Sequence, residues 1–234
     1  MTEQNVRTAL MVEASSTLSS CTAPYIDGAD INRRYQKIAP SKRIRLDVQG
    51  WSCKPAVLYK SPKIMIRQAG VGIVATVDMS NAYCPQSVYI YRLKDEYAGQ
   101  GYTHEFLLAS LLSRTMAYYI FKRFGEIDPA KAHAKLTHDR LESLPVPRLD
   151  LSLSRHRHLH KDIVGNVRKL LSGEASLGGL EDGAIELSLR ELWQVTPDDG
   201  AYINGQFYGL DNSQVVRDLF PKGPPKPQDM VVIR

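Results

Sequence analysis

Residues 102–147 carry the strongest pattern of apolar positions in the chain. Apolar residues cover most of the surface of a predicted helix from Phe106 to Phe124, and a helix of this kind is buried on more than one side. Thr103 can cap this helix, and Glu105 lies in its first turn, where the helix dipole favours a carboxylate. We therefore expect a core helix around which the rest of the chain is organised.

Helix signals continue beyond this core helix. Gly125 follows Lys122 and Arg123 and ends it. Asp128 caps a short second helix that has proline at its first position. Thr137 caps a third short helix, which ends before a proline.

Alternating apolar and polar residues predict strands before the core helix. One strand covers residues 43–48 and has a charged face, which is equally typical of an ordinary solvated strand. Residues 64–77 form a predicted hairpin with its turn at Gly70. A further strand at 88–91 places two tyrosines on one face, where half-burial in a sheet is their commonest role.

Helical patterns return after the core region. Residues 150–173 are predicted to form a helix that ends at Gly173, and weaker helical patterns follow at 184–193 and 215–219. Apolar positions and histidines recur at spacings of three and four along the first of these helices, which favours packing on a partner helix. The residues that we expect to bind a partner are Leu153, His160, Ile163, Val167 and Leu170.

Length and composition limit the class of protein. A chain of 234 residues with 43% hydrophobic content supports one large domain, or one domain with a small appendage. No apolar run has membrane length, no signal peptide is evident, and three scattered cysteines fit the cytoplasm. A net charge of +5 permits nucleic-acid binding without establishing it.

The order of motifs resembles a known family. The apolar helix is followed by Lys-Leu-Thr and then by Leu-Glu-Ser-Leu-Pro-Val-Pro. This order is similar to the TaqI-like C-terminal specificity domain, the target recognition domain of type I and type IIG restriction-modification DNA methyltransferases. The similar segments are residues 28–35, 62–67, 108–113, 118–119, 135–137, 141–147 and 207–210. Leu112 stands where the family usually has Asn.

The resemblance implies a fold and a division of the chain. The expected fold is α+β, with a twisted, β-rich target recognition domain whose partly closed sheet packs on a buried helix, followed by a helical C-terminal segment. The expected parts are an N-terminal arm (1–22), the recognition domain (23–149), a connecting and partner-binding helix (150–173), a C-terminal helical segment (174–220) and a Pro-rich tail (221–234).

Catalytic motifs are absent from the sequence. A DNA amino-methyltransferase needs an Asn/Asp-Pro-Pro-Tyr/Phe loop to hold the flipped base, and the chain has none. It also lacks a glycine-rich methyl-donor loop, a carboxylate two residues before a lysine, and a GxSxG motif. We therefore expect no catalytic residue, no metal and no cofactor, with S-adenosylmethionine bound only by a partner subunit.

The leading hypothesis is a non-catalytic subunit or domain that recognises a specific double-stranded DNA sequence in a restriction-modification or related phage-defence system. It would position an adenine methyltransferase or nuclease partner, and a two-part target would require a homodimer or a second domain. Cationic side chains would neutralise phosphates, and a few side chains would read base edges in the major groove. The candidates, with base and phosphate contacts not separated, are Arg33, Arg34, Lys42, Arg43, Arg45, Lys63, Arg67 and Gln68.

Two other functions remain open. A protein-binding adaptor derived from the same fold would use the 150–173 helix and would lack DNA specificity. An unrecognised enzyme, such as a nuclease, would use His104, His133 or His138. A metal-dependent cleavage assay distinguishes the enzyme from the DNA-recognition domain. Partner binding that survives high salt, without a DNA preference, distinguishes the adaptor.

Overall fold

A computed structural model describes residues 11–13, 21–48, 54–69, 72–124, 137–210 and 214–226. The turn at Gly70, the helix end at Gly125, the second short helix at Asp128, and His133 lie outside the described residues, as do most of the N-terminal arm and the end of the tail. The fold is α+β, as predicted, with helices and two small antiparallel sheets. The partly closed sheet stays a prediction.

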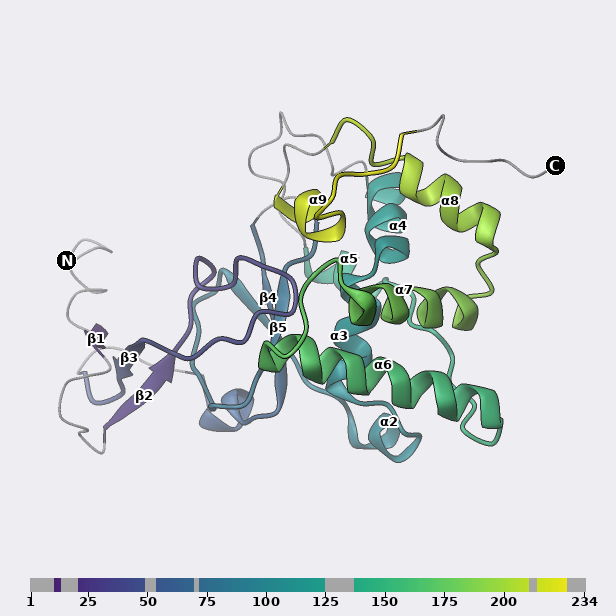
Figure 1. Cartoon of the computed structure of the whole chain (residues 1–234). Helices are drawn as coiled ribbons and strands as arrows, with labels where there is room; N and C mark the ends of the chain where they lie inside the picture. The colour runs from purple at the N-terminus through teal and green to yellow at the C-terminus, as the bar shows by residue number, and fades with distance from the viewer. Residues whose placement is uncertain are drawn as a thin grey trace.

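The first sheet lies on the opposite side of the molecule from most of the helices (Figure 1). Its order is β1 (Met11–Glu13), β3 (Lys42–Arg45) and β2 (Thr22–Tyr25), all antiparallel. The strand predicted at residues 43–48 is therefore confirmed, one residue earlier at its start and three residues shorter at its end. A parallel bridge between Tyr25 and Tyr83 links this sheet to the segment before β6.

The second sheet contains the predicted hairpin. β4 (Lys63–Arg67) lies between β5 (Ala75–Asp78) and β6 (Val88–Tyr91), and it pairs antiparallel with both. Ile64 and Ile66 face the main core together with the two tyrosines of β6, whereas Met65 faces a second apolar cluster. The 3-10 helix η1 (Ala56–Tyr59) precedes β4 along the chain.

The predicted single helix from Phe106 to Phe124 is wrong, because two helices occupy this stretch. α3 (His104–Leu112) and α4 (Arg114–Phe124) are separated by Ser113, whose backbone is extended at φ −71° and ψ 158°. The Ser113 hydroxyl accepts the Met116 backbone N–H at 3.0 Å and so caps α4. The apolar pattern crosses the break without interruption, so hydrophobic periodicity could not reveal it.

Two helix starts in this region follow the predicted capping rules. The side chain of Thr103 accepts the Phe106 backbone N–H, and the side chain of Thr137 accepts the Arg140 backbone N–H. These threonines begin α3 and α5 (His138–Glu142), while α2 (Asp95–Gly99) lies before α3. The capping signals were therefore sufficient to place both starts.

Buried charges hold the two sides of the α3–α4 break. Arg34 donates from Nε to the carbonyl oxygen of Leu112, the last residue of α3, at 2.9 Å. Glu186 accepts the backbone N–H groups of Arg114 and Thr115 at the start of α4, at 2.8 and 3.3 Å. A cation at a helix C-terminus and a carboxylate at a helix N-terminus both complement the helix dipoles. The break is therefore a stabilised junction.

The same charges connect with one another. Arg34 and Arg114 lie 3.5 and 3.8 Å from the two carboxylate oxygens of Asp182. Arg190 donates to Glu186 at 3.2 Å. The backbone N–H of Arg34 also donates to Asp218, a buried residue of the last helix. We call the six residues that share these contacts the junction network: Arg34, Arg114, Arg190, Asp182, Glu186 and Asp218.

The C-terminal helices pack on α3 and surround this network. The helices are α6 (Ser154–Ser172), α7 (Leu180–Leu192), α8 (Pro197–Gly205) and α9 (Gln214–Leu219). α6 and α7 lie side by side with α3 behind them (Figure 1). α6 ends at Gly173, as predicted, with that glycine in the left-handed conformation at φ 82°.

α6 places its apolar stripe inside the chain. Ile163 and Val167 are fully buried and Leu170 is buried, and all three belong to the core that includes α3 and α7. The prediction that these three bind a partner is therefore wrong, because their apolar surface is already covered. His160 packs on Phe106 with ring centroids 5.4 Å apart, and Leu153 remains 50% exposed.

Replacing Arg34 with alanine should lower the free energy of unfolding by about 3 kcal/mol or more, because Asp182 would lose a buried cationic partner and the backbone carbonyl oxygens of Leu112 and Asp218 would each lose a hydrogen bond. Urea denaturation measures this change. Arg33→Ala, which removes the exposed neighbouring arginine, should change the same quantity by less than about 0.5 kcal/mol. Equal effects of the two substitutions would contradict the network.

Ile163→Ala should lower the free energy of unfolding by about 2–5 kcal/mol, because it opens a cavity in the core between α6 and α3. Leu153→Ala on the same helical stripe should change it by less than about 0.5 kcal/mol. Thermal and urea denaturation of both variants test whether the stripe is internal. A nearly neutral Ile163→Ala would restore the partner-binding interpretation.

Candidate nucleic-acid interface

The loop of residues 26–41 covers one face of the second sheet. Its apolar residues Ile26, Ile31 and Ile38 pack in the apolar cluster that includes Met65 and Val88. The Thr76 hydroxyl of β5 donates to the Gln36 carbonyl oxygen at 2.5 Å, which fixes the middle of the loop to the sheet. The loop therefore presents its polar side chains on a rigid support.

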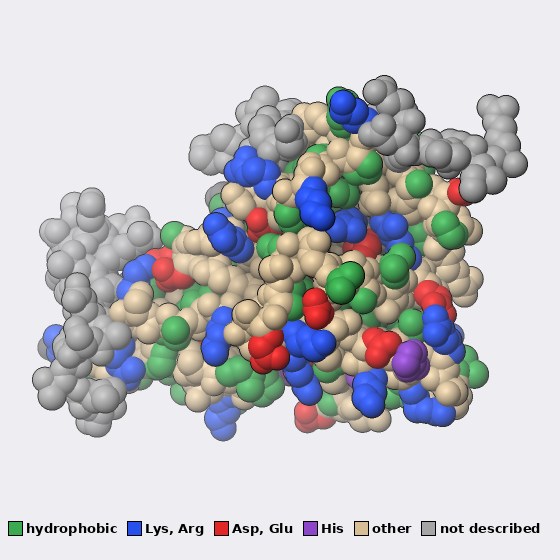
Figure 2. Space-filling model, viewed as in Figure 1, with side chains coloured by type: hydrophobic (Ala, Val, Ile, Leu, Met, Phe, Trp, Pro, Cys, Tyr) green, Lys and Arg blue, Asp and Glu red, His purple; other side chains and the backbone are tan. Residues whose placement is uncertain are grey.

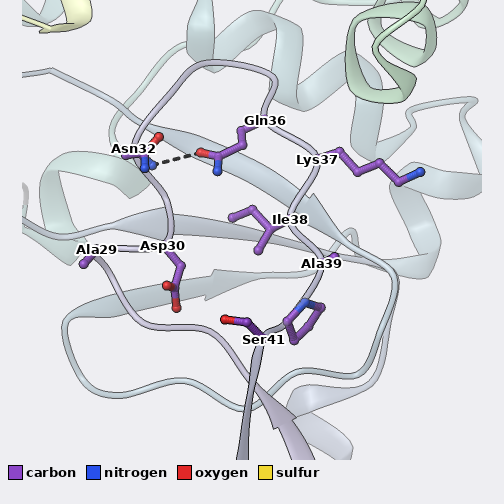
Figure 3. Close-up of a pocket in the computed structure, with 9 residues that line it drawn as sticks. Ala29, Asp30, Asn32, Gln36, Lys37, Ile38, Ala39 and Ser41 are labelled. Carbon is purple, nitrogen blue, oxygen red and sulfur yellow. Dashed lines mark hydrogen bonds between the residues drawn. The ribbon is translucent and has the colours of Figure 1, made fainter. Parts of the chain in front are cut away.

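Nine residues of this loop line a polar hollow of about 300 Å³ (Figure 3). The Gln36 side-chain oxygen accepts the backbone N–H groups of Asn32 and Arg33, at 3.1 and 3.2 Å, and so closes a turn at one edge. Asp30 places its carboxylate near the hollow, whereas the Lys37 side chain extends away from it (Figure 3). Because the Asp30 carboxylate beside the hollow is acidic, a phosphate would favour exposed cations of the loop over the interior of the hollow.

Arg33 and Lys37 are cations of the 26–41 loop. Both residues are exposed, and no hydrogen bond or ion pair to either side chain is formed within the described ranges. Cations of this kind can contact phosphates without first breaking an internal pair. Lys37 was missed in the sequence analysis, although its position four residues after Arg33 in a polar loop was an available signal.

Lys42 is engaged by two carboxylates. Its ammonium lies 2.8 Å from Asp27 and 3.2 Å from Asp30, and these hydrogen bonds raise the pKa of Lys42. Burial works to raise the pKa of Asp27, but the hydrogen bond and charge of Lys42, together with the backbone N–H groups of Ala29 and Asp30, outweigh it, so the pKa is lowered. Lys42 therefore fastens the start of β3 to the 26–41 loop, and its charge is already neutralised.

Two arginines of β3 also have local partners. Arg43 donates to the side chain and the backbone carbonyl of Thr22 at 2.9 and 3.0 Å. Arg45 is exposed and donates to Asp47 at 3.2 Å. An exposed pair such as Arg45 with Asp47 contributes little to stability, so Arg45 loses little free energy when it exchanges this partner. Their predicted role stays a prediction.

Arg34 and Lys63 are corrections to the predicted set. Arg34 is 4% exposed inside the junction network, and Lys63 is fully buried. The Lys63 ammonium donates to the Tyr59 carbonyl oxygen at 2.8 Å and forms an ion pair with Asp78. The prediction that these two cations contact DNA is wrong, because neither side chain reaches the surface.

Arg67 and Gln68 lie at the end of β4, beside the 26–41 loop. A Cβ atom placed on Gly28 would lie 3.4 Å from Arg67 Cγ, so the arginine stem rests against this loop. Arg67 is half-buried, and its buried Nε has no acceptor among the described residues. Gln68 donates from Nε2 to the Tyr89 hydroxyl at 2.7 Å. The structure therefore brings Arg67 close to the loop that carries Arg33 and Lys37.

A group of three aromatic rings lies next to Gln68. Tyr89 and Tyr91 come from β6, and His138 comes from α5. The ring of His138 lies 5.8 Å from that of Tyr89 and 5.6 Å from that of Tyr91. The Tyr91 hydroxyl lies 3.1 Å from His138 Nδ1, and burial raises the pKa of Tyr91 to about 12. Tyr91 therefore stays neutral at physiological pH and serves as a hydrogen-bonding group. His138 also lies 3.4 Å from Glu142.

Basic side chains do not form a continuous stripe on the face in view in Figure 2, because acidic side chains are interspersed with them. Within the described ranges, no group of three or more histidine, cysteine or acidic side chains could hold a metal ion. None of the described helices is long and apolar enough to cross a membrane. The 26–41 loop and the end of β4 present polar and charged side chains side by side.

The family comparison defines the class of this protein. Residues 23–146 match the model of the TaqI-like C-terminal specificity domain, and this segment is more than half of the 234-residue chain. The chain therefore belongs to this family, whose members are specificity domains of restriction-modification systems rather than catalytic domains. The family implies DNA binding and association with a methyltransferase. A comparison with curated proteins found no match.

The buried pair of Lys63 and Asp78 makes stability depend on pH. Burial works to raise the pKa of Asp78, but hydrogen bonds from Lys63 and Ser80 outweigh it and hold the pKa below its ordinary value. The unfolded chain therefore takes up this proton more readily than the native protein does. The stabilisation is present above the ordinary aspartate pKa of about 3.9 and is lost as the pH falls through the lower native pKa.

Asp78→Asn should therefore lower the free energy of unfolding at pH 7 by about 3–5 kcal/mol, because Lys63 would be left buried without a counter-charge. The difference from the unsubstituted protein should shrink below about pH 4. Urea denaturation at a series of pH values measures both effects. Asp47→Asn, which removes the exposed partner of Arg45, should leave the curve nearly unchanged. An unaltered stability of Asp78→Asn at pH 7 would refute this account.

Proposed function

We propose that this chain recognises a specific double-stranded DNA sequence as the specificity domain of a restriction-modification or related phage-defence system. An adenine methyltransferase or nuclease would supply the chemistry in the cytoplasm, and any S-adenosylmethionine would be bound by that partner. The chain itself would be non-catalytic and would need no cofactor. Family membership over residues 23–146 is the observation that carries this proposal.

The charges of the 26–41 loop support the proposal. Arg33 and Lys37 lie within the matched segment, are exposed, and have no partner among the described residues. Cations that are free in the unbound protein gain the full attraction of a phosphate and release its condensed counterions. Lys42 beside them is already paired with Asp27 and Asp30, so it would shape the loop without contacting the DNA.

The adaptor hypothesis has one observation in its favour. Leu180 and Leu187 lie on the same face of α7, outside the matched segment, and are 89% and 68% exposed. Residues seven positions apart on a helix share a face, so these two side chains form an apolar stripe that a protein partner could cover. A methyltransferase subunit seated there would be compatible with DNA recognition by the 26–41 loop.

Selection of duplex DNA with a randomised central segment, at about 150 mM salt, tests the proposed function directly. The purified chain should enrich one short motif, and its affinity should fall steeply as salt rises. The same selection is repeated with a candidate methyltransferase subunit present. Failure to enrich any motif in both selections would reject DNA recognition and leave the adaptor hypothesis.

Arg33→Ala and Lys37→Ala should each weaken binding to all duplex sequences alike. Each should also make the slope of log affinity against log salt shallower by about 0.9, the contribution of one phosphate contact. Lys161→Ala is the matched control, because it removes one exposed lysine of α6, outside the matched segment. An equal loss in all three variants would show that overall charge, and not the loop, determines binding.

A further inference from the structure

The backbone at the end of β4 is held on both sides. The Arg67 N–H donates to the Val74 carbonyl oxygen at 3.0 Å, and the Gln68 N–H donates to the Ser87 carbonyl oxygen at 2.9 Å. β4 is the central strand of its sheet, so both neighbouring segments fix its end. A side chain on such a support is presented to a ligand at a defined position.

The Arg67 side chain differs from those of Arg34 and Arg45. Arg34 and Arg45 each pair with a carboxylate, whereas Arg67 has no acidic partner within the described ranges. Its stem lies against Gly28 and near Ser87, and its Nε is buried without an acceptor. Burial lowers the pKa of Arg67, although a guanidinium stays charged at any physiological pH. A partly desolvated cation with unused donors is unfavourable in the free protein and is typical of a binding group.

The donors of a guanidinium match two acceptors that lie side by side in a plane. In the DNA major groove, the O6 and N7 atoms of guanine present this pair, and arginine contacts them through two parallel hydrogen bonds. A phosphate also offers paired acceptors, but exposed cations such as Arg33 and Lys37 suit this role. A half-buried guanidinium on a fixed strand end suits a base edge, because its direction is set before binding.

We infer that Arg67 reads a guanine in the major groove of the DNA target, while Arg33 and Lys37 contact the phosphate backbone. This inference rests on the proposed DNA recognition. It assigns a base contact to Arg67 and phosphate contacts to Arg33 and Lys37. The guanidinium forms two hydrogen bonds to guanine O6 and N7, and a duplex with another base at that position lacks this pair of acceptors. Arg67 is then a specificity-determining residue.

The test compares the motifs selected by three forms of the full chain from duplex DNA with a randomised central segment. The unsubstituted chain should enrich a motif that contains an invariant guanine. Arg67→Ala should lose the preference at that guanine alone and bind the selected duplex about 10- to 100-fold more weakly. Arg33→Ala should retain the whole motif and weaken binding to every sequence.

A second measurement leaves the protein unchanged. Replacing the invariant guanine by 7-deazaguanine removes the N7 acceptor, so the unsubstituted chain should bind this duplex more weakly, whereas Arg67→Ala should bind both duplexes equally. The thermal unfolding of Arg67→Ala should match that of the unsubstituted chain, because no internal partner of the guanidinium is lost among the described residues.

Three outcomes would overturn the inference. An unchanged motif in Arg67→Ala would show that this side chain reads no base. A uniform loss of affinity for all sequences would assign Arg67 to a phosphate. If the unsubstituted chain enriches a motif and either result follows, DNA recognition stands and only the role of Arg67 fails. If the unsubstituted chain enriches no motif, the proposed function fails together with this inference.

Discussion

Three arginines and three carboxylates meet in the interior of this protein where α3 ends and α4 begins. Arg34 reaches this point from the 26–41 loop, Asp182 and Glu186 from α7, and Asp218 from α9. Burial of a charge is tolerable only when its partners are in place, so each of these segments depends on the others. Arg34, which follows Arg33 in the 26–41 loop, thereby fixes the loop that presents Arg33 and Lys37. The geometry of the candidate DNA surface therefore depends on contacts far from that surface.

Electrostatic pairing divides the basic residues of the chain into two groups with different roles. Arg34, Lys42 and Lys63 are bound to carboxylates and hold segments together. Arg33, Lys37 and Arg67 have no such partners among the described residues and remain available to an external anion or base. A paired cation would have to give up one interaction to gain another, whereas an unpaired cation gains the whole of the new interaction. This distinction supports the assignment of DNA contacts more strongly than net charge does, because acidic and basic groups are interspersed on the face shown in Figure 2.

The candidate site could be predicted from the sequence only in outline. A basic residue at a given position has the same local signature whether it is buried or exposed, so Arg34 and Arg33 could not be distinguished by pattern. The burial of Lys63 could not be predicted from its sequence neighbours either. Its counter-charge Asp78 lies on the neighbouring strand and becomes its partner only when β4 and β5 pair. On α6, the spacing of apolar residues correctly indicated a helix with one apolar face. It could not indicate that α3 and α7 of the same chain cover that face.

The sequence by itself determined the features that depend on neighbouring residues. These features are the helix caps at Thr103 and Thr137, the helix end at Gly173 and the β4–β5 hairpin. They could be predicted because turn chemistry and alternation act over a few positions. The family motifs could be read directly from the order of residues. The sequence also carries a capping signal at the start of α8, in Thr196 and Pro197. Only the tertiary structure decided the break at Ser113, since the groups that stabilise it, Arg34 and Glu186, lie 78 and 72 residues from their backbone partners. Long-range burial and ion pairing also decided which basic side chains are structural and which remain free for DNA.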